Sequence, residues 1–107
     1  MKFSIIIPLY NRPTEIDELL DSLTRQTFKD FDVIVVEDGS NVRSDSIIEK
    51  YRPQLDIKYY YKQNSGPGTT RNYGAERSEG DYFVFFDSDC IIPDDYMAIV
   101  ADRKSGV

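Results

Sequence analysis

Residues 2–8 have the sequence K-F-S-I-I-I-P, a short run dominated by apolar and β-branched side chains. Such a run predicts a strand that is buried on both faces, as the strands of a parallel sheet are. The segment Pro13–Gln26 follows it, and its apolar residues recur at the spacing of one helical face: Ile16, Leu19, Leu20 and Leu23. The chain therefore opens with a buried strand and an amphipathic helix.

The same alternation continues along the rest of the chain. We expect further strands at Phe31–Val36, Asp56–Tyr61 and Asp81–Phe86, and further helices at Ser44–Tyr51, Thr69–Arg77 and Asp94–Lys104, with Pro93 as the first residue of the last helix. Strand–helix repetition at this spacing predicts an α/β fold, an open and mostly parallel sheet of about four strands with helices on both faces. Residues 1–107 are expected to form a single domain.

The composition limits the classes of protein to which the chain can belong. With 40% hydrophobic and 30% charged residues, it is typical of a folded globular protein and not of a disordered one. The net charge of -6 argues against a nucleic-acid surface, which needs a basic stripe. A phosphorylated ligand would need a metal ion or a few local arginines. The single cysteine, Cys90, excludes an internal disulfide and a cysteine zinc cluster.

The sequence also bears on location. No run of residues has the length of a transmembrane helix or the layout of a signal peptide. We therefore expect a cytoplasmic protein, and this includes the cytoplasmic face of a membrane if a longer parent protein carries an anchor.

Polar residues follow three of the expected strands at the point where each strand ends. Tyr10-Asn11-Arg12 follows the first strand, Glu37-Asp38 the second and Asp87-Ser88-Asp89 the fourth. Right-handed crossovers place the carboxyl ends of parallel strands at one edge of the sheet, and ligands of open α/β sheets bind at that edge. The sequence therefore predicts one binding site built from all three segments.

Two aspartates, Asp87 and Asp89, suggest a metal ion at this edge. Side chains alternate along an extended chain, so both carboxylates can point to the same side. Like charges this close repel unless a cation or hydrogen-bond donors lie between them. Hard oxygen ligands suit Mg²⁺ or Mn²⁺, which often bridge a protein carboxylate to a substrate phosphate. The alternative is a solvated acidic turn.

Three more side chains are candidates for ligand contacts. Asp38 can accept a hydrogen bond from a base or a sugar, and the alternative is a role in the turn at Gly39. Tyr10 can stack on a planar base, and the alternative is packing at the sheet edge. Arg71 follows a glycine-rich turn ahead of a helix, where it can face a phosphate or pair with a strand-end carboxylate. A plain turn with a surface arginine is the alternative there.

Five ordered blocks of the sequence resemble the opening of the family 2 glycosyltransferases. They are residues 4–12 (S-I-I-I-P-L-Y-N-R), 26–32 (Q-T-F-K-D-F-D), 35–40 (V-V-E-D-G-S), 66–75 (G-P-G-T-T-R-N, then Gly74-Ala75) and 87–89 (D-S-D). The resemblance covers essentially the whole chain. It implies the GT-A fold, a Rossmann-like nucleotide-binding sheet that takes sugar nucleotides, often UDP-sugars, and usually a Mn²⁺ or Mg²⁺ ion.

The resemblance also implies roles for individual residues. Pro8 and Tyr10 would lie against the base, Asp38 would hydrogen-bond its edge, and Arg71 would help to hold the nucleotide. Asp87 would lie near the ribose or the metal, with Ser88 in the same nucleotide site, and Asp89 would be the metal ligand that bridges to the diphosphate. Glu37 departs from the aspartate that is common at its position.

No acid in this chain matches the catalytic base of the family, which we expect beyond Val107 in an acceptor-binding half. We therefore interpret the chain as the donor-binding half of an enzyme that the resemblance implies is inverting, and we expect this half alone to bind nucleotide weakly and to transfer nothing. The acceptor would be a saccharide or a lipid-linked molecule. Apolar surface left exposed could also pair copies of the chain.

Two other functions fit parts of the pattern. A phosphorylation-receiver module is also a small parallel α/β domain with clustered aspartates and Mg²⁺, but its acidic pair follows the first strand, which here ends in P-L-Y-N-R. A nucleotidyltransferase is suggested by the run G-T-T-R at residues 68–71. Those enzymes place their glycine-rich loop just after the first strand, so this alternative ranks last.

Overall fold

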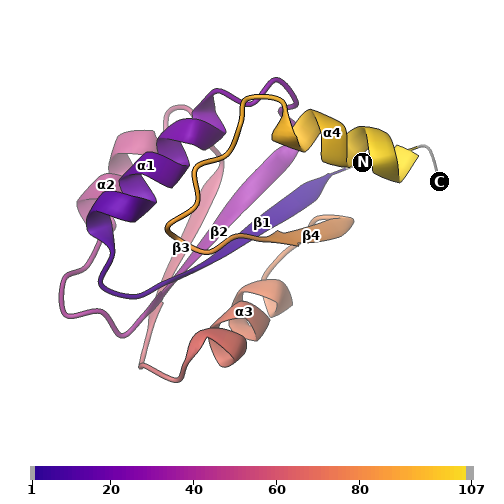
Figure 1. The fold of residues 1–107 in the computed structure, drawn as a ribbon. Coiled ribbons are helices and arrows are strands. Elements are labelled where there is room, and N and C mark those ends of the chain that lie inside the picture. Colours follow the sequence, from indigo (N-terminus) through magenta and orange to yellow (C-terminus); the bar gives the residue numbers. More distant parts are fainter. Residues whose placement is uncertain (1, 106–107) are drawn as a thin grey trace.

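The computed structural model describes residues 2–105, in which four strands alternate with four helices (Figure 1). Their bounds are β1 (Phe3–Leu9), α1 (Pro13–Thr24), β2 (Phe31–Asp38), α2 (Asp45–Tyr51), β3 (Ile57–Lys62), α3 (Pro67–Glu76), β4 (Tyr82–Phe85) and α4 (Tyr96–Ser105). The strands form one sheet in the order β3-β2-β1-β4, and every pairing is parallel. The α/β fold expected from the alternation is confirmed, and all strands end at the same edge.

Helices cover both faces of the sheet. Figure 1 shows α1, α2 and α4 above the sheet and α3 below it. The larger core lies under the three upper helices and includes Ile5, Leu20 and Met97, each with no exposed surface. The four apolar positions expected on one face of α1 are all buried. A smaller cluster of Ile6, Ile34 and Val36 lies on the side of α3. Burial of each such side chain contributes about 1.5–3 kcal/mol relative to its exposed state.

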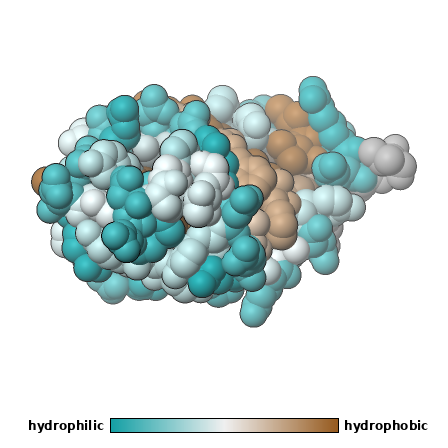
Figure 2. Space-filling view, turned by 90° about the horizontal axis from the view of Figure 1, so that it is seen from below, coloured by the Kyte–Doolittle hydropathy of each residue, from teal (hydrophilic) through white to brown (hydrophobic). Residues whose placement is uncertain are grey.

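The strand β4 is an edge strand and is largely exposed, although its apolar run resembles that of a buried strand. Among residues 2–105 it pairs only with β1, and its residues Tyr82, Phe83 and Phe85 are 37%, 46% and 47% exposed. The apolar sequence of β4 is that of a central strand, but α3 packs against β1 and β2 and leaves the lower face of β4 uncovered. Figure 2 shows an apolar patch on this underside of the molecule, beside hydrophilic surface.

Helix α2 begins at Asp45, one residue later than expected, and two other helices begin two residues away from their expected starts. Helix α3 begins at Pro67, two residues early, because proline lacks the N–H that the first helical turn leaves unbonded. Helix α4 begins at Tyr96, and Pro93 lies ahead of it. The Pro93 carbonyl accepts hydrogen bonds from Gln26 Nε2 (2.7 Å) and Tyr96 N (3.0 Å). Asp94 and Asp95 form the turn between Pro93 and the start of α4. Within residues 2–105, every helix is too short or too polar to cross a membrane.

Candidate functional site

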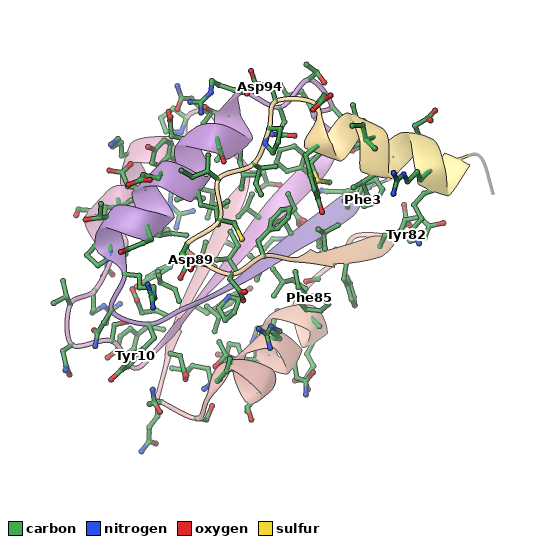
Figure 3. The ribbon with its side chains drawn as sticks, in the orientation of Figure 1. Phe3, Tyr10, Tyr82, Phe85, Asp89 and Asp94 are labelled. Atoms are coloured by element: carbon green, nitrogen blue, oxygen red, sulfur yellow. The ribbon has the colours of Figure 1, made fainter. Side chains whose placement is uncertain are left out.

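A cleft of about 780 Å³ lies at the edge of the sheet where the strands end. Its lining residues come from the end of β1 and the loop after it, the end of β2, the start of α1, the loop between β3 and α3 with the first residue of α3, and the loop after β4. They are Pro8, Leu9, Tyr10, Asn11, Arg12, Glu15, Asp38, Asn64, Gly66, Pro67, Asp87, Ser88 and Asp89. Figure 3 shows the labelled Tyr10 and Asp89 at this side of the molecule. The structure thus brings together six of the seven residues expected in the site. The seventh, Arg71, is not part of the lining but reaches it through Asp87.

The end of β1 supplies the aromatic side chain of the cleft. Strand β1 is buried except at the partly exposed Pro8, and the chain then turns at Asn11, whose φ is 50°. Tyr10 stands just before that turn with 48% of its surface exposed. A half-exposed aromatic ring on a cleft wall is available for stacking on a planar ligand.

Asp38 is buried at the end of β2, and its carboxylate holds the loop between β3 and α3. Oδ1 accepts hydrogen bonds from Lys62 Nζ (3.0 Å) and Ser65 N (2.9 Å), and Oδ2 accepts one from Gly66 N (3.0 Å). Burial of the carboxyl opposes its ionisation, but these hydrogen bonds outweigh burial and lower its pKa. Asp38 therefore holds a loop that is distant in the sequence, and these side-chain bonds are not to the turn at Gly39.

Lys62 was missed by the sequence analysis. Its side chain is 13% exposed, and besides Asp38 it donates to Gln63 O and to Ser65 Oγ. The signal was available, because Lys62 ends β3 at the same sheet edge as the polar residues that end β1 and β2. Glu15 and Asn64, which line the cleft, were also missed.

Glu37 does not line the cleft. It is fully buried, and it accepts hydrogen bonds from Tyr59 OH (2.8 Å), Ser44 N (2.9 Å) and Ser40 Oγ (2.5 Å). Burial, and then the hydrogen bond to Glu37, raise the pKa of Tyr59 well above its ordinary value. The tyrosine therefore stays protonated and continues to donate to the carboxylate.

The acidic loop after β4 lies on the other wall of the cleft. Asp87 Oδ1 accepts a hydrogen bond from Arg71 Nη2 at 3.2 Å, and the Asp87 side chain is 70% exposed. Ser88 is buried and Asp89 is exposed. Among residues 2–105, no cluster of three or more His, Cys, Asp or Glu side chains could hold a metal by itself. Two carboxylates do fit Mg²⁺ or Mn²⁺ that takes its remaining ligands from water and a substrate phosphate.

The lowered pKa of Asp38 leads to a prediction about acid stability. A carboxyl whose pKa is lower in the folded than in the unfolded state stabilises the fold above about pH 4, and this contribution is lost as the pH falls through the folded-state pKa. The difference in free energy of unfolding between the wild type and Asp38→Ala is therefore expected to narrow as the pH is lowered from about 7 to about 3. Urea titrations across that range measure it.

Other lowered carboxyl pKa values act equally in both proteins, so the difference isolates Asp38. They are those of Asp17, lowered first by a hydrogen bond from Tyr51, and of Asp45, lowered first by one from Arg43. A difference that stays constant from neutral to acidic pH would mean that Asp38 is not held ionised by its partners.

Comparisons with known proteins show the family to which the chain is similar. The family model described as Glycosyl transferase family 2 matches residues 4–103. The poly(ribitol-phosphate) beta-N-acetylglucosaminyltransferase TarS of Staphylococcus aureus is 43% identical over 93 residues, which cover 83% of this chain and 16% of that protein. The crystal structure of S. aureus TarS 1-349 in complex with UDP-GlcNAc matches with a TM-score of 0.93 and 40% identity, over 99% of this chain and 32% of that one.

A more distant structure shares the fold alone. The mannosyltransferase PcManGT from Pyrobaculum calidifontis, solved with GDP-Man and Mn²⁺, matches with a TM-score of 0.80 and 23% identity, over 86% of this chain and 28% of that one. This chain therefore spans a third or less of each of these proteins.

Proposed function

The chain belongs to glycosyl transferase family 2, and on that basis we propose that it is the donor-binding half of a longer enzyme that transfers a sugar from a nucleotide diphosphate sugar to an acceptor. The GT-A fold expected from the resemblance is shared with solved glycosyltransferases. The comparisons support neither the receiver module nor the nucleotidyltransferase. One observation carries the proposal: Tyr10, Asp38 and Asp89, far apart in the sequence, line a single cleft.

We place the base and ribose of the donor between the end of β1 and Asp38. The exposed Tyr10 ring would stack on the base beside Pro8. Each oxygen of the Asp38 carboxylate has two lone pairs, and Oδ2 accepts one hydrogen bond from the described residues. In the proposed complex this carboxylate would also accept an N–H or O–H of the nucleoside.

We place the diphosphate between the acidic loop and the start of α3. Gly66 and Pro67 bring the first turn of this ten-residue helix to the cleft, where its dipole favours an anion. Arg71 lies close enough to exchange its bond with Asp87 for one with a phosphate oxygen. Asp89, together with Asp87, would hold Mg²⁺ or Mn²⁺, which supplies positive charge against the leaving diphosphate.

The donor is proposed to be a UDP-sugar, since the related TarS was crystallised with UDP-GlcNAc. The acceptor is proposed to be a saccharide or a lipid-linked molecule, met in the cytoplasm or at the cytoplasmic face of a membrane. In an inverting enzyme a carboxylate deprotonates the acceptor hydroxyl. We expect that base beyond Val107, because this chain spans only 32% of the solved relative.

Titration calorimetry with UDP tests the proposal. The wild type is expected to bind UDP in the presence of Mn²⁺ and to bind it at least about tenfold more weakly after chelation or in Asp89→Ala, because a metal-bridged phosphate contact is lost. Asp95→Ala is the matched control, since it removes another exposed acid, from the turn before α4 and outside the cleft lining. It should bind UDP within about twofold of the wild type.

Two results would contradict the proposal. A wild type that binds no UDP with either metal would refute the donor site itself. Equal affinity of the wild type, Asp89→Ala and the chelated protein would refute the metal role and leave the nucleotide role standing.

A further inference from the structure

The adjacent acids Glu37 and Asp38 hold loops on opposite faces of the sheet. Neighbouring side chains of a strand point to opposite faces, and Val35 accordingly packs in the core under α1 and α2, whereas Val36 packs on the side of α3. Asp38 holds the loop before α3, as described above. Glu37 lies on the other face, where two of its three donors, Ser40 Oγ and Ser44 N, belong to the loop between β2 and α2.

This hydrogen-bond network continues from Glu37 to the rim of the cleft. The Ser40 hydroxyl donates to Glu37 Oε2 and accepts from Asn11 N at 2.8 Å. The Asn11 side chain then returns to the same loop, because its Oδ1 accepts from Asn41 N (2.8 Å) and Val42 N (3.2 Å). Asn11 is thus bonded to the loop between β2 and α2 through both its backbone and its side chain.

The backbone of Asn11 explains why an asparagine stands here. Its φ of 50° lies in the left-handed region, which asparagine visits more readily than most residues because its short side chain bonds locally. The neighbours Tyr10 and Arg12 line the cleft. Since the Tyr10 ring is about half exposed, packing does little to hold it, and its place depends on the backbone that Asn11 anchors.

We infer that Asn11 is a positioning residue for the nucleotide. Held by Glu37 through Ser40, it joins the loop after β1 to the loop after β2 and so keeps Tyr10 and Arg12 at the rim of the cleft. The inference rests on the proposed function. It adds Asn11, whose Oδ1 bonds to the loop between β2 and α2 and would act on the nucleotide through that loop.

Two substitutions separate the side-chain oxygen of Asn11 from its backbone conformation. Asn11→Gly keeps the left-handed φ without strain but removes Oδ1, whereas Asn11→Asp keeps both an acceptor oxygen and tolerance of that φ. The first readout is amide hydrogen exchange at Asn41 and Val42 without ligand. The second is UDP affinity with Mn²⁺ by calorimetry, at about 1 M salt so that the charge added by aspartate is screened.

In Asn11→Gly, the amide hydrogens of Asn41 and Val42 are expected to exchange about tenfold faster than in the wild type. The variant is also expected to bind UDP about tenfold more weakly, and a tenfold change in affinity corresponds to about 1.4 kcal/mol. Asn11→Asp is expected to restore both values to within about threefold of the wild type. Ser40→Ala removes the link to Glu37 and the acceptor of Asn11 N but keeps the Asn11 side chain. It should also weaken UDP binding, by about fivefold.

The outcomes distinguish this inference from the proposed function. If the wild type binds UDP and Asn11→Gly binds it equally well, or if Asn11→Asp restores neither value, the inference is wrong and the donor site stands. If the wild type does not bind UDP, the proposed function fails first and the inference falls with it.

Discussion

Asp38→Ala is expected to lower the free energy of unfolding by about 3–5 kcal/mol, the cost of removing one partner from a buried ion pair. The side chains of Asp38 and Lys62 are only 6% and 13% exposed, and their Oδ1 and Nζ atoms are 3.0 Å apart. The substitution also leaves Ser65 N and Gly66 N without the acceptor that holds the loop before α3. Urea unfolding at neutral pH, followed by circular dichroism, measures the change.

The double variant Asp38→Ala/Lys62→Met provides the control. It removes the stranded ammonium group together with its partner, so it should recover part of the stability that the single variant loses. A loss below about 1 kcal/mol in the single variant would mean that Lys62 is satisfied by Gln63 O and Ser65 Oγ alone, and that Asp38 does not organise the loop.

Gly39→Ala is expected to destabilise the protein by about 3 kcal/mol, through two effects at the residue after Asp38. Gly39 has a φ of +70°, and a left-handed conformation costs alanine about 1–2 kcal/mol. An added Cβ would also lie 2.6 Å from Asn64 N, a backbone atom, and overpacking of this kind costs about 1–3 kcal/mol. The close approach matters for the site, because Asn64 lines the cleft and its Nδ2 donates to Asp38 O.

Substitutions of two other glycines are controls that separate the cost of the backbone conformation from the cost of a steric clash. Gly66 has a φ of +95° but open space around the added Cβ, so Gly66→Ala should show the strain alone, about 1–3 kcal/mol. Gly68 lies in α3 with neither constraint, and Gly68→Ala should be neutral or stabilising by up to about 1 kcal/mol. Thermal unfolding of the three variants should therefore rank Gly39→Ala as the least stable. If Gly39→Ala unfolds at no lower a temperature than Gly66→Ala, the loop at Asn64 shifts to accommodate the added Cβ at little cost in stability.

Most of the fold was predictable from patterns that are local in the sequence. The apolar spacing of Ile16, Leu19, Leu20 and Leu23 predicted the buried face of α1 because helical geometry alone sets that spacing. The apolar run of β4 was predicted as a strand, but its exposure was not predictable, because burial depends on which helix lies over the strand. Sequence periodicity carries no information about that neighbour.

The residues of the candidate site were likewise predictable only in part. Tyr10, Asp38 and Asp89 were named from residue type and from their place after a strand, and parallel connections then required them to share an edge. The partners of these residues were not predictable. Lys62 and Ser65 meet Asp38 across more than twenty residues, and nothing in the chain next to Asp38 indicates which donors its carboxylate accepts.

The sequence by itself determined the alternation of strands and helices and the residue types that stand at the sheet edge, because each depends on chemistry within one segment. Only the tertiary structure decided how the acids are used: Glu37 and Asp38 serve loops on opposite faces, and Asp87 pairs with Arg71 while Asp89 stays exposed. The physical reason is that a hydrogen bond depends on atoms lying within about 3 Å of each other, and folding alone brings such atoms from separate segments together.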